Sequence, residues 1–370
     1  MPTQSARLAT PDHFTGCLLG GAVGDALGAA LELLSHEQIH ERFGPLGISE
    51  YAQMYGRLGA FTDDTQMSLF TAEGLLRGYV RLRHRGITTY SGVTANAYLR
   101  WLRSQGETPS CEFGAREESG GWLIGHADLH QRRGPGDTCL SALRAMSSLG
   151  APAQNSSKGC GGVMRMAPVG LFAARASGGA RECFDLGCEL AALTHGHPTG
   201  YLTAGAFAVL ILGLITGNTL PQSLHLAKDL LSGRPDHQET LQALERAERL
   251  SEHTLPPPQA IAQLGQGWVA EEALAIAVYC ALVAKDFRHG VCLAVNHGGD
   301  SDSTGAITGN LLGAQLGSAA IPRSWLEPLE LREVIEEIAR DLFDFSTWEI
   351  GEWSQNPEQD RQIWAKYPGF

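Results

Sequence analysis

The sequence predicts an all-α fold. Apolar residues recur at the three- and four-residue spacing of amphipathic helices, alternating strand patterns are nearly absent, and glycine forms two regular stripes. The expected helices are 65–82, 94–104, 185–193, 201–216, 222–232, 236–251, 270–285 and 330–343. Short strands within the glycine-rich loops remain compatible with this pattern.

The glycine stripes place a glycine at every fourth residue, which keeps them along one face of a helix. They comprise Gly16, Gly20, Gly24 and Gly28, and then Gly305, Gly309, Gly313 and Gly317. Each glycine costs about 0.5–1 kcal/mol of helix propensity relative to alanine. That cost indicates close backbone approach by another helix or a ligand. Tight helix packing alone accounts for it, and the same packing would bring distant segments together around a site.

The overall charge narrows the choice of partners. The chain has 370 residues, a net charge of −12 and a pI near 5.5. A length of this kind allows a large buried core. The acidic balance argues against broad nucleic-acid binding, which needs a basic face. An anionic ligand stays compatible, because backbone N–H groups and a few local cations can bind it.

Cysteine use and the N-terminus favour a cytoplasmic protein. The eight cysteines, at 17, 111, 139, 160, 183, 188, 280 and 292, contain no C-x-x-C pair and are irregularly spaced. This argues against a structural zinc site and favours a reducing compartment. The segment Met1 to Pro11 has no apolar stretch typical of a secretory signal. The most apolar stretch, 201–217, is slightly short for a membrane span and is expected to be a buried core helix.

One domain over residues 1–370 is expected. The segment 233–259 contains a charged amphipathic helix and then three consecutive prolines, which predicts a polar surface insertion. The last thirty residues are rich in aromatic side chains, which we expect to dock onto the body. They are Trp348, Trp353, Trp364, Tyr367 and Phe370.

Two carboxylate clusters each stand directly before an expected helix. The first is Thr62-Asp63-Asp64-Thr65, and the second is Asp300-Ser301-Asp302-Ser303-Thr304. Such residues are ordinary helix N-caps, which complete free N–H groups and favour the helix dipole. Capping needs only one side chain, however, and neighbouring carboxylates repel each other unless a cation lies between them.

Together the clusters offer four carboxylates and several hydroxyls, with no cysteine or obligatory histidine. Hard oxygen ligands of this kind favour Mg²⁺ or Mn²⁺ over Zn²⁺. Four carboxylates exceed the charge of one divalent ion, so two metals are expected. No twelve-residue loop of the EF-hand pattern is present.

Three further motifs are candidate ligand contacts. The glycine-rich loop 155–162 lacks the order of a P-loop and follows no strand, but its N–H groups can form a phosphate-binding concavity. A tight turn is the alternative. The His195-Gly196-His197 motif starts an apolar helix, where capping or core hydrogen bonding competes with metal binding. Glu32 follows Gly28 by four residues and is otherwise an ordinary surface residue.

These motifs resemble the ADP-ribosylglycohydrolase family, which includes ADP-ribosylarginine hydrolase and dinitrogenase-reductase-activating glycohydrolase. The matching segments occur in family order over almost the whole chain. They are GGAVGDALGAALE (20–32), FTDDT (61–65), NSSKGCGGVMRMAPVGL (155–171), THGHP (194–198), GQGWVAEEAL (265–274) and NHGGDSDSTGAI (296–307). The paired TDDT and GGDSDSTG motifs carry most of the specificity. SKGCG and the DSDST order are similar to the arginine-hydrolase branch.

The resemblance implies a compact all-α fold with a binuclear Mg²⁺ centre, with Mn²⁺ as the alternative. Its metal ligands map onto Thr62, Asp63, Asp64, Asp300, Asp302 and Ser303. Many members carry threonine where Ser303 stands, so the neighbouring Thr304 is an alternative ligand. The catalytic candidates are Asp63, Asp64, Asp302 and Glu32, and Glu32 matches a mobile glutamate near the metals. The candidate substrate contacts are Ser157, Gly159, Gly161 and His195.

The expected activity is hydrolysis of the glycosidic bond between ADP-ribose and a modified protein, with ADP-ribose as product. Arginine-linked protein is the substrate that the resemblance to the arginine-hydrolase branch implies, and an arginine-linked substrate would need little further acid catalysis. Serine-linked ADP-ribose, O-acetyl-ADP-ribose and ADP-ribosylated nucleic acid are alternatives, the last disfavoured by charge. A catalytically silent ADP-ribose-binding or immunity module is another, against which the complete set of ligand positions argues. No membrane partner is expected.

Overall fold

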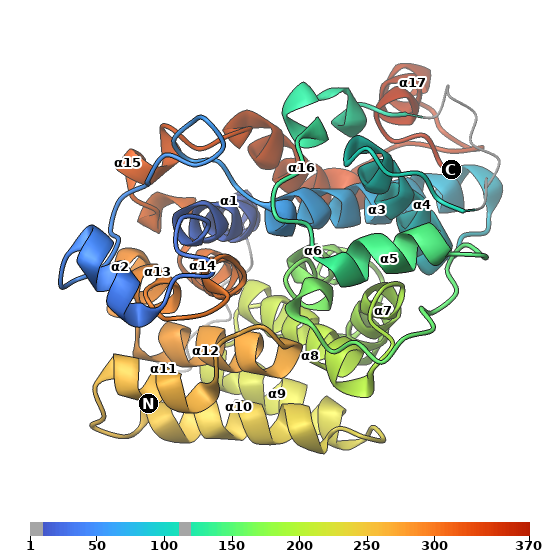
Figure 1. Cartoon of the computed structure of the whole chain (residues 1–370). Helices are drawn as coiled ribbons and strands as arrows, with labels where there is room; N and C mark the ends of the chain where they lie inside the picture. Colours follow the sequence, from blue (N-terminus) through green and yellow to red (C-terminus); the bar gives the residue numbers. More distant parts are fainter. Residues whose placement is uncertain (1–9, 111–119) are drawn as a thin grey trace.

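A computed structural model of the chain describes residues 10–110 and 120–370 and confirms the all-α prediction (Figure 1). Within these ranges there is no sheet, only isolated bridges between Met54 and Arg57 and between Gly159 and Val269. The α-helices are α1 (Pro11–Gly28), α2 (His36–Phe43), α3 (Asp63–Arg85), α4 (Tyr90–Ser104), α5 (Asp137–Ala145), α6 (Ala167–Ala173), α7 (Ala180–Ala192), α8 (Pro198–Ile215), α9 (Leu220–Ser232), α10 (Gln238–Ser251), α11 (Pro257–Leu264), α12 (Ala270–Val283), α13 (Phe287–Val295), α14 (Ser301–Leu316), α15 (Arg323–Leu326), α16 (Arg332–Asp344) and α17 (Pro357–Lys366).

Helices α1 and α14 run antiparallel through the middle of the molecule in direct backbone contact (Figure 1). A Cβ added to Gly16 would lie 2.6 Å from the Gly313 oxygen, and one added to Gly305 would lie 2.5 Å from the Gly24 oxygen. The glycine stripes therefore exist because no side chain fits between the two helices. Gly317 departs from the prediction, because it follows the end of α14 with a φ of 81°.

This crossing brings the C-terminal end of α1 against the N-terminal end of α14. A Cβ added to Gly28 would clash with the backbone of Ser301, which belongs to the second carboxylate cluster. Glu32 lies one turn beyond Gly28. The helix pair thus decides which parts of the sequence surround the candidate site.

Helix α8 is the apolar core helix that the sequence predicts. Among the described residues it is the one helix long and apolar enough to cross a membrane, with a mean hydropathy of 1.7 over 18 residues. Protein covers 89% of this window. Its N-cap is His197, whose side chain accepts a hydrogen bond from the Thr199 N–H at 3.1 Å. That histidine therefore serves in capping.

The two expected surface features differ in part from the structure. Within 233–259, α10 buries Leu244, Ala247 and Leu250 in the hydrophobic core and packs against α12. This segment therefore contributes to the body rather than lying wholly on its surface. In the C-terminal tail, Trp348 and Tyr367 are buried as expected, but Trp353 is 87% exposed and does not dock.

The thiols of the described cysteines are unpaired, in keeping with the expected reduced state. Burial raises the pKa of the Cys292 thiol to about 11, and it raises those of Cys17 and Cys280 further. Cys111 and the first nine residues, where no secretory signal is expected, lie outside the described residues.

Candidate metal centre and active site

Both carboxylate clusters form the first turns of helices, as predicted. Thr62 is the N-cap of α3 and accepts a hydrogen bond from the Asp64 N–H at 3.4 Å. Asp300 is the N-cap of α14 and accepts one from the Ser303 N–H at 3.3 Å. Capping therefore explains one side chain in each cluster. Asp63 and Asp64, in the first turn of α3, are left for another role.

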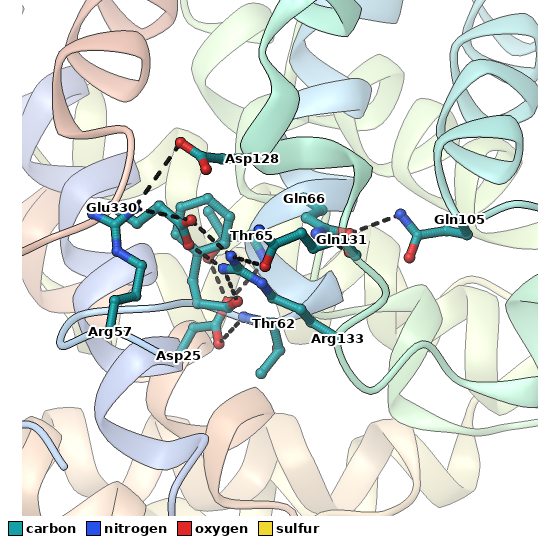
Figure 2. Close-up of polar contacts among 11 residues, drawn as sticks. Asp25, Arg57, Thr62, Thr65, Gln66, Gln105, Asp128, Gln131, Arg133 and Glu330 are labelled. Carbon is teal, nitrogen blue, oxygen red and sulfur yellow. Dashed lines mark hydrogen bonds and ion pairs between the residues drawn. The ribbon is translucent and has the colours of Figure 1, made fainter. Parts of the chain in front are cut away.

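Asp25 of α1 joins the first cluster to the helix crossing. Its carboxylate accepts hydrogen bonds from the Thr62 N–H at 2.8 Å, the Thr65 N–H at 3.0 Å and the Thr65 hydroxyl at 2.5 Å (Figure 2). The side chain is fully buried. Asp25 thus orients the start of α3 relative to α1, and through α1 relative to α14. Sequence reasoning missed this residue.

The carboxylates form one buried, mutually repelling group. Asp63, Asp64, Asp300 and Asp302 are each at most 4% exposed. Burial raises their pKa values, and the charge of Asp302 raises those of the other three further. A hydrogen bond from the Thr62 hydroxyl acts in the opposite direction on the pKa of Asp302, which places the two clusters in contact. The two acidic segments, which are distant in the sequence, therefore lie together.

This group fits hard divalent cations in its chemistry. The Asp64 Oδ2 atom is buried without a hydrogen-bond donor, and buried acceptors normally have a partner. Oxygen ligands in such number are typical of Mg²⁺ or Mn²⁺. Among the described residues, no three His, Cys, Asp or Glu side chains are placed close enough to hold a metal ion by themselves. The hydroxyls of Thr62 and Ser303 are two further oxygen atoms that could bind such a cation.

The glycine-rich loop reaches the same group. The Cys160 thiol lies by Asp300, Asp64 and Ser303, and its pKa is raised by burial and by the two carboxylate charges. The loop backbone is fixed by hydrogen bonds from Cys160 N to the Trp268 oxygen at 3.2 Å and from Ala270 N to the Lys158 oxygen at 2.8 Å. The loop therefore borders the carboxylates with its backbone held in place.

The candidate substrate contacts sit in or beneath this loop. The Ser157 hydroxyl accepts a hydrogen bond from the Gly159 N–H at 3.3 Å. His195 lies under the loop, where a Cβ added to Gly161 would approach its ring to 3.1 Å. Its side chain is 1% exposed, and burial with the nearby Arg165 charge lowers its pKa to about 3. His195 is therefore neutral and supports the loop from below.

A buried ion pair fixes the other side of the site. The Arg133 guanidinium pairs with Glu330 through both nitrogens and donates to the Phe61 oxygen at 3.1 Å (Figure 2). The Arg133 oxygen accepts from the Asp63 N–H at 3.1 Å. Both charged side chains are at most 1% exposed. The pair ties the loop before α5 and the start of α16 to the first carboxylate cluster.

Glu32 faces the carboxylates from the end of α1. Burial raises its pKa to about 8, and the charges of Asp302 and Asp25 contribute in the same direction. A Cβ added to Gly134 would lie 3.7 Å from its Oε2, 3.8 Å from the Tyr55 hydroxyl and 3.9 Å from Asp63 Oδ1. These oxygens thus come from separate segments and surround one glycine.

Comparison with known proteins identifies the family. A model described as ADP-ribosylglycohydrolase matches residues 5–350. The chain belongs to the ADP-ribosylglycohydrolase family. The matched range holds both carboxylate clusters, the glycine-rich loop and Glu32, so the site described above lies within the family domain.

Some of the similar proteins are named as hydrolases. An uncharacterized protein of Archaeoglobus fulgidus is 30% identical, over 90% of this chain and 96% of its own. ADP-ribosylarginine hydrolase Tri1 of Serratia proteamaculans is 24% identical, over 90% and 79%. The ADP-ribosyl-[dinitrogen reductase] glycohydrolase of Rhodospirillum rubrum is 25% identical, over 90% and 94%. A solved structure, an ADP-ribosylglycohydrolase-related protein complex, is 28% identical with a TM-score of 0.64, covering 91% of this chain and 98% of its own.

In this ADP-ribosylglycohydrolase the structure separates Ser303 from its neighbour Thr304. The Thr304 hydroxyl contacts the Ala294 and Asp300 oxygens, both at 2.8 Å, and the His297 ring at 2.9 Å. The Ser303 hydroxyl lies instead toward Met164 and Cys160, at the side of the carboxylates. This arrangement favours Ser303 over Thr304 as the hydroxyl that faces the site.

Proposed function

We propose that this chain is an ADP-ribosylarginine hydrolase that uses two Mg²⁺ ions, with Mn²⁺ as the alternative metal. The observation that carries the proposal is the buried convergence of the starts of α3 and α14, with the Asp64 Oδ2 atom left without a donor. Relatives named as arginine hydrolases align with nine-tenths of the chain. The substrate is therefore proposed to be ADP-ribosyl-arginine in protein.

Six residues would hold the ions in this proposal. They are Thr62, Asp63, Asp64, Asp300, Asp302 and Ser303. When bound, two such ions supply Lewis acidity and a water molecule of lowered pKa. The chain prepares for them by fixing the backbone of both clusters: Asp25 holds one and the α1–α14 contact holds the other.

The remaining steps are assigned to the protein's own groups. The backbone of the loop, with Ser157, Gly159 and Gly161, would bind the diphosphate, and His195 would support it from below. Glu32, whose pKa is raised to about 8 by burial and by the charges of Asp302 and Asp25, is the candidate for exchanging a proton with water or the leaving group. Nearby carboxylates stabilise positive charge that develops on the ribose when the bond breaks. The guanidinium of the substrate is already protonated, so it leaves as neutral guanidine without acid catalysis and takes up the proton that the attacking water releases.

The test is release of ADP-ribose from an arginine-modified protein, with and without Mg²⁺. We expect activity that EDTA abolishes and Mg²⁺ restores, and an Asp302→Ala variant without activity. A parallel series with serine-linked ADP-ribose and O-acetyl-ADP-ribose assigns the linkage. Binding of ADP-ribose without turnover of any substrate would replace the proposal by a silent binding module, and full activity of Asp302→Ala would refute the assigned centre.

A further inference from the structure

Tyr55 occupies an unusual backbone position beside the carboxylates. Met54 and Arg57 exchange two backbone hydrogen bonds of 3.0 Å, so Tyr55 and Gly56 form the tip of a two-residue hairpin turn. Their φ angles are 50° and 83°, the positive signs that such a turn requires. Glycine and asparagine are common there, whereas a bulky aromatic residue is strained. Strained residues of this kind cluster at functional sites.

Two arginines hold the turn and the tyrosine ring in place. Arg57 pairs with Glu330 at 3.2 Å, and Glu330 is also the partner of buried Arg133 (Figure 2). The Arg133 guanidinium lies over the Tyr55 ring, 5.3 Å from its centroid. The ring is therefore fixed by a stacked guanidinium, although 39% of the residue remains exposed.

The Tyr55 hydroxyl lies on the side of the site where Glu32 and Asp63 are found. The missing side chain of Gly134 leaves a gap bordered by the Tyr55 hydroxyl, Glu32 and Asp63, with contacts of 3.7–3.9 Å to an added Cβ. Leu33, directly after Glu32, is a second non-glycine residue with positive φ, and it is 78% exposed. Both sides of the gap thus carry a strained backbone and reach solvent.

This gap lies away from the loop that is proposed to bind ADP-ribose. The loop meets the carboxylates at Asp300 and Asp64, through the Cys160 thiol. The Tyr55 hydroxyl instead lies around Gly134 together with Glu32 and Asp63. A substrate that places its diphosphate on the loop and its ribose at the carboxylates would direct the linked side chain to the Tyr55 side.

We propose that Tyr55, Gly134 and Glu32 form the subsite for the leaving group, and that it binds a planar cation such as the guanidinium of a modified arginine. An aromatic ring and a carboxylate are the groups that bind a guanidinium by stacking and by paired hydrogen bonds. The Arg133 guanidinium on the Tyr55 ring already shows this mode of contact. The inference rests on the arginine-hydrolase function proposed above.

The test compares Tyr55→Asn and Tyr55→Phe with a matched control, Tyr90→Phe. Asparagine accepts the positive φ but removes the ring, and phenylalanine keeps the ring. Tyr90 is a half-buried tyrosine that packs against Phe172, away from the carboxylates. Two quantities are measured for each protein with Mg²⁺: kcat/KM for release of ADP-ribose from an arginine-modified peptide, and Kd for free ADP-ribose, which lacks a leaving group.

We expect Tyr55→Asn to lower kcat/KM about tenfold while Kd for ADP-ribose stays within about twofold, in line with the usual strength of such cation contacts. Tyr55→Phe should retain most of the activity, and Tyr90→Phe all of it. Equal losses in Tyr55→Phe and Tyr55→Asn, or a parallel loss of ADP-ribose binding, would overturn the subsite. Wild-type protein that releases no ADP-ribose from arginine would instead refute the proposed function itself, and the subsite with it.

Discussion

The contact between α1 and α14 makes a sharp prediction for Gly309→Ala. A Cβ at this position would lie 2.5 Å from the Gly20 carbonyl carbon and closer still to its oxygen, whereas ordinary contacts begin at 3.4 Å. The obstacle is backbone, so no side-chain rotation relieves it, and the helices must separate by more than an ångström. Overpacking of this kind costs about 1–3 kcal/mol. The gain in helix propensity offsets only about 0.5–1 kcal/mol of this cost.

We therefore expect the free energy of unfolding of Gly309→Ala to fall by about 1–2 kcal/mol, measured by urea denaturation followed by tryptophan fluorescence. We also expect kcat/KM to fall by more than the loss of folded protein accounts for, because the α1–α14 crossing sets the position of Asp302 relative to Asp25. Gly92→Ala in α4 is the matched control. Its added Cβ meets the Thr89 hydroxyl, the movable end of a side chain, so stability should be unchanged or higher. A Gly309→Ala variant as stable as Gly92→Ala would refute the reasoning.

Four further predictions concern the site and its supports. Asp25→Asn should lower activity at least about tenfold with an unchanged circular dichroism spectrum, because the carboxylate that accepts three hydrogen bonds is lost. Glu330→Gln should lower the free energy of unfolding in urea by about 3–5 kcal/mol, since it leaves the buried Arg133 charge unpaired. Saturating Mg²⁺ should stabilise the wild type by about 2.7 kcal/mol at a hundredfold excess over Kd, and Asp64→Asn should abolish this shift in thermal unfolding. The folded-state pKa of His195, about 3, lies below its ordinary value of 6.5, so protonation of the unfolded chain weakens stability as pH falls from 6.5 toward 3. Urea unfolding at pH 7, 6 and 5 should show the free energy of unfolding fall by up to about 1.4 kcal/mol per pH unit, and His195→Asn should lack this loss.

Helix prediction succeeded where the apolar or amphipathic segment is long. Residues 65–82 lie within α3, 201–216 largely coincide with α8, and 330–343 largely coincide with α16. Helix α6 was missed, because it is only seven residues long and all of its residues are buried. A short apolar run of this kind fits a buried strand as well as a buried helix, so periodicity alone does not identify it.

Some of the site could also be predicted from local pattern. Each carboxylate cluster begins a helix, and this arrangement can be predicted because helix capping depends only on residues that are neighbours in the sequence. The glycine spacing further indicated that a close helix contact would bring remote segments together. Asp25 went unnoticed because it stands within the first glycine stripe, where its neighbours suggest only packing.

The sequence by itself determined the helical class, the two oxygen-rich helix starts and the family to which the chain belongs. Only the tertiary structure decided which groups meet. The Arg133–Glu330 pair joins residues 197 positions apart, and the gap beside Tyr55 depends on backbone angles and on an absent side chain at Gly134. Helix propensity and capping act over a few residues, so they are visible in a sequence. Contacts between remote segments depend on the path of the whole chain, and apart from the glycine spacing of α1 and α14 no local periodicity indicates them.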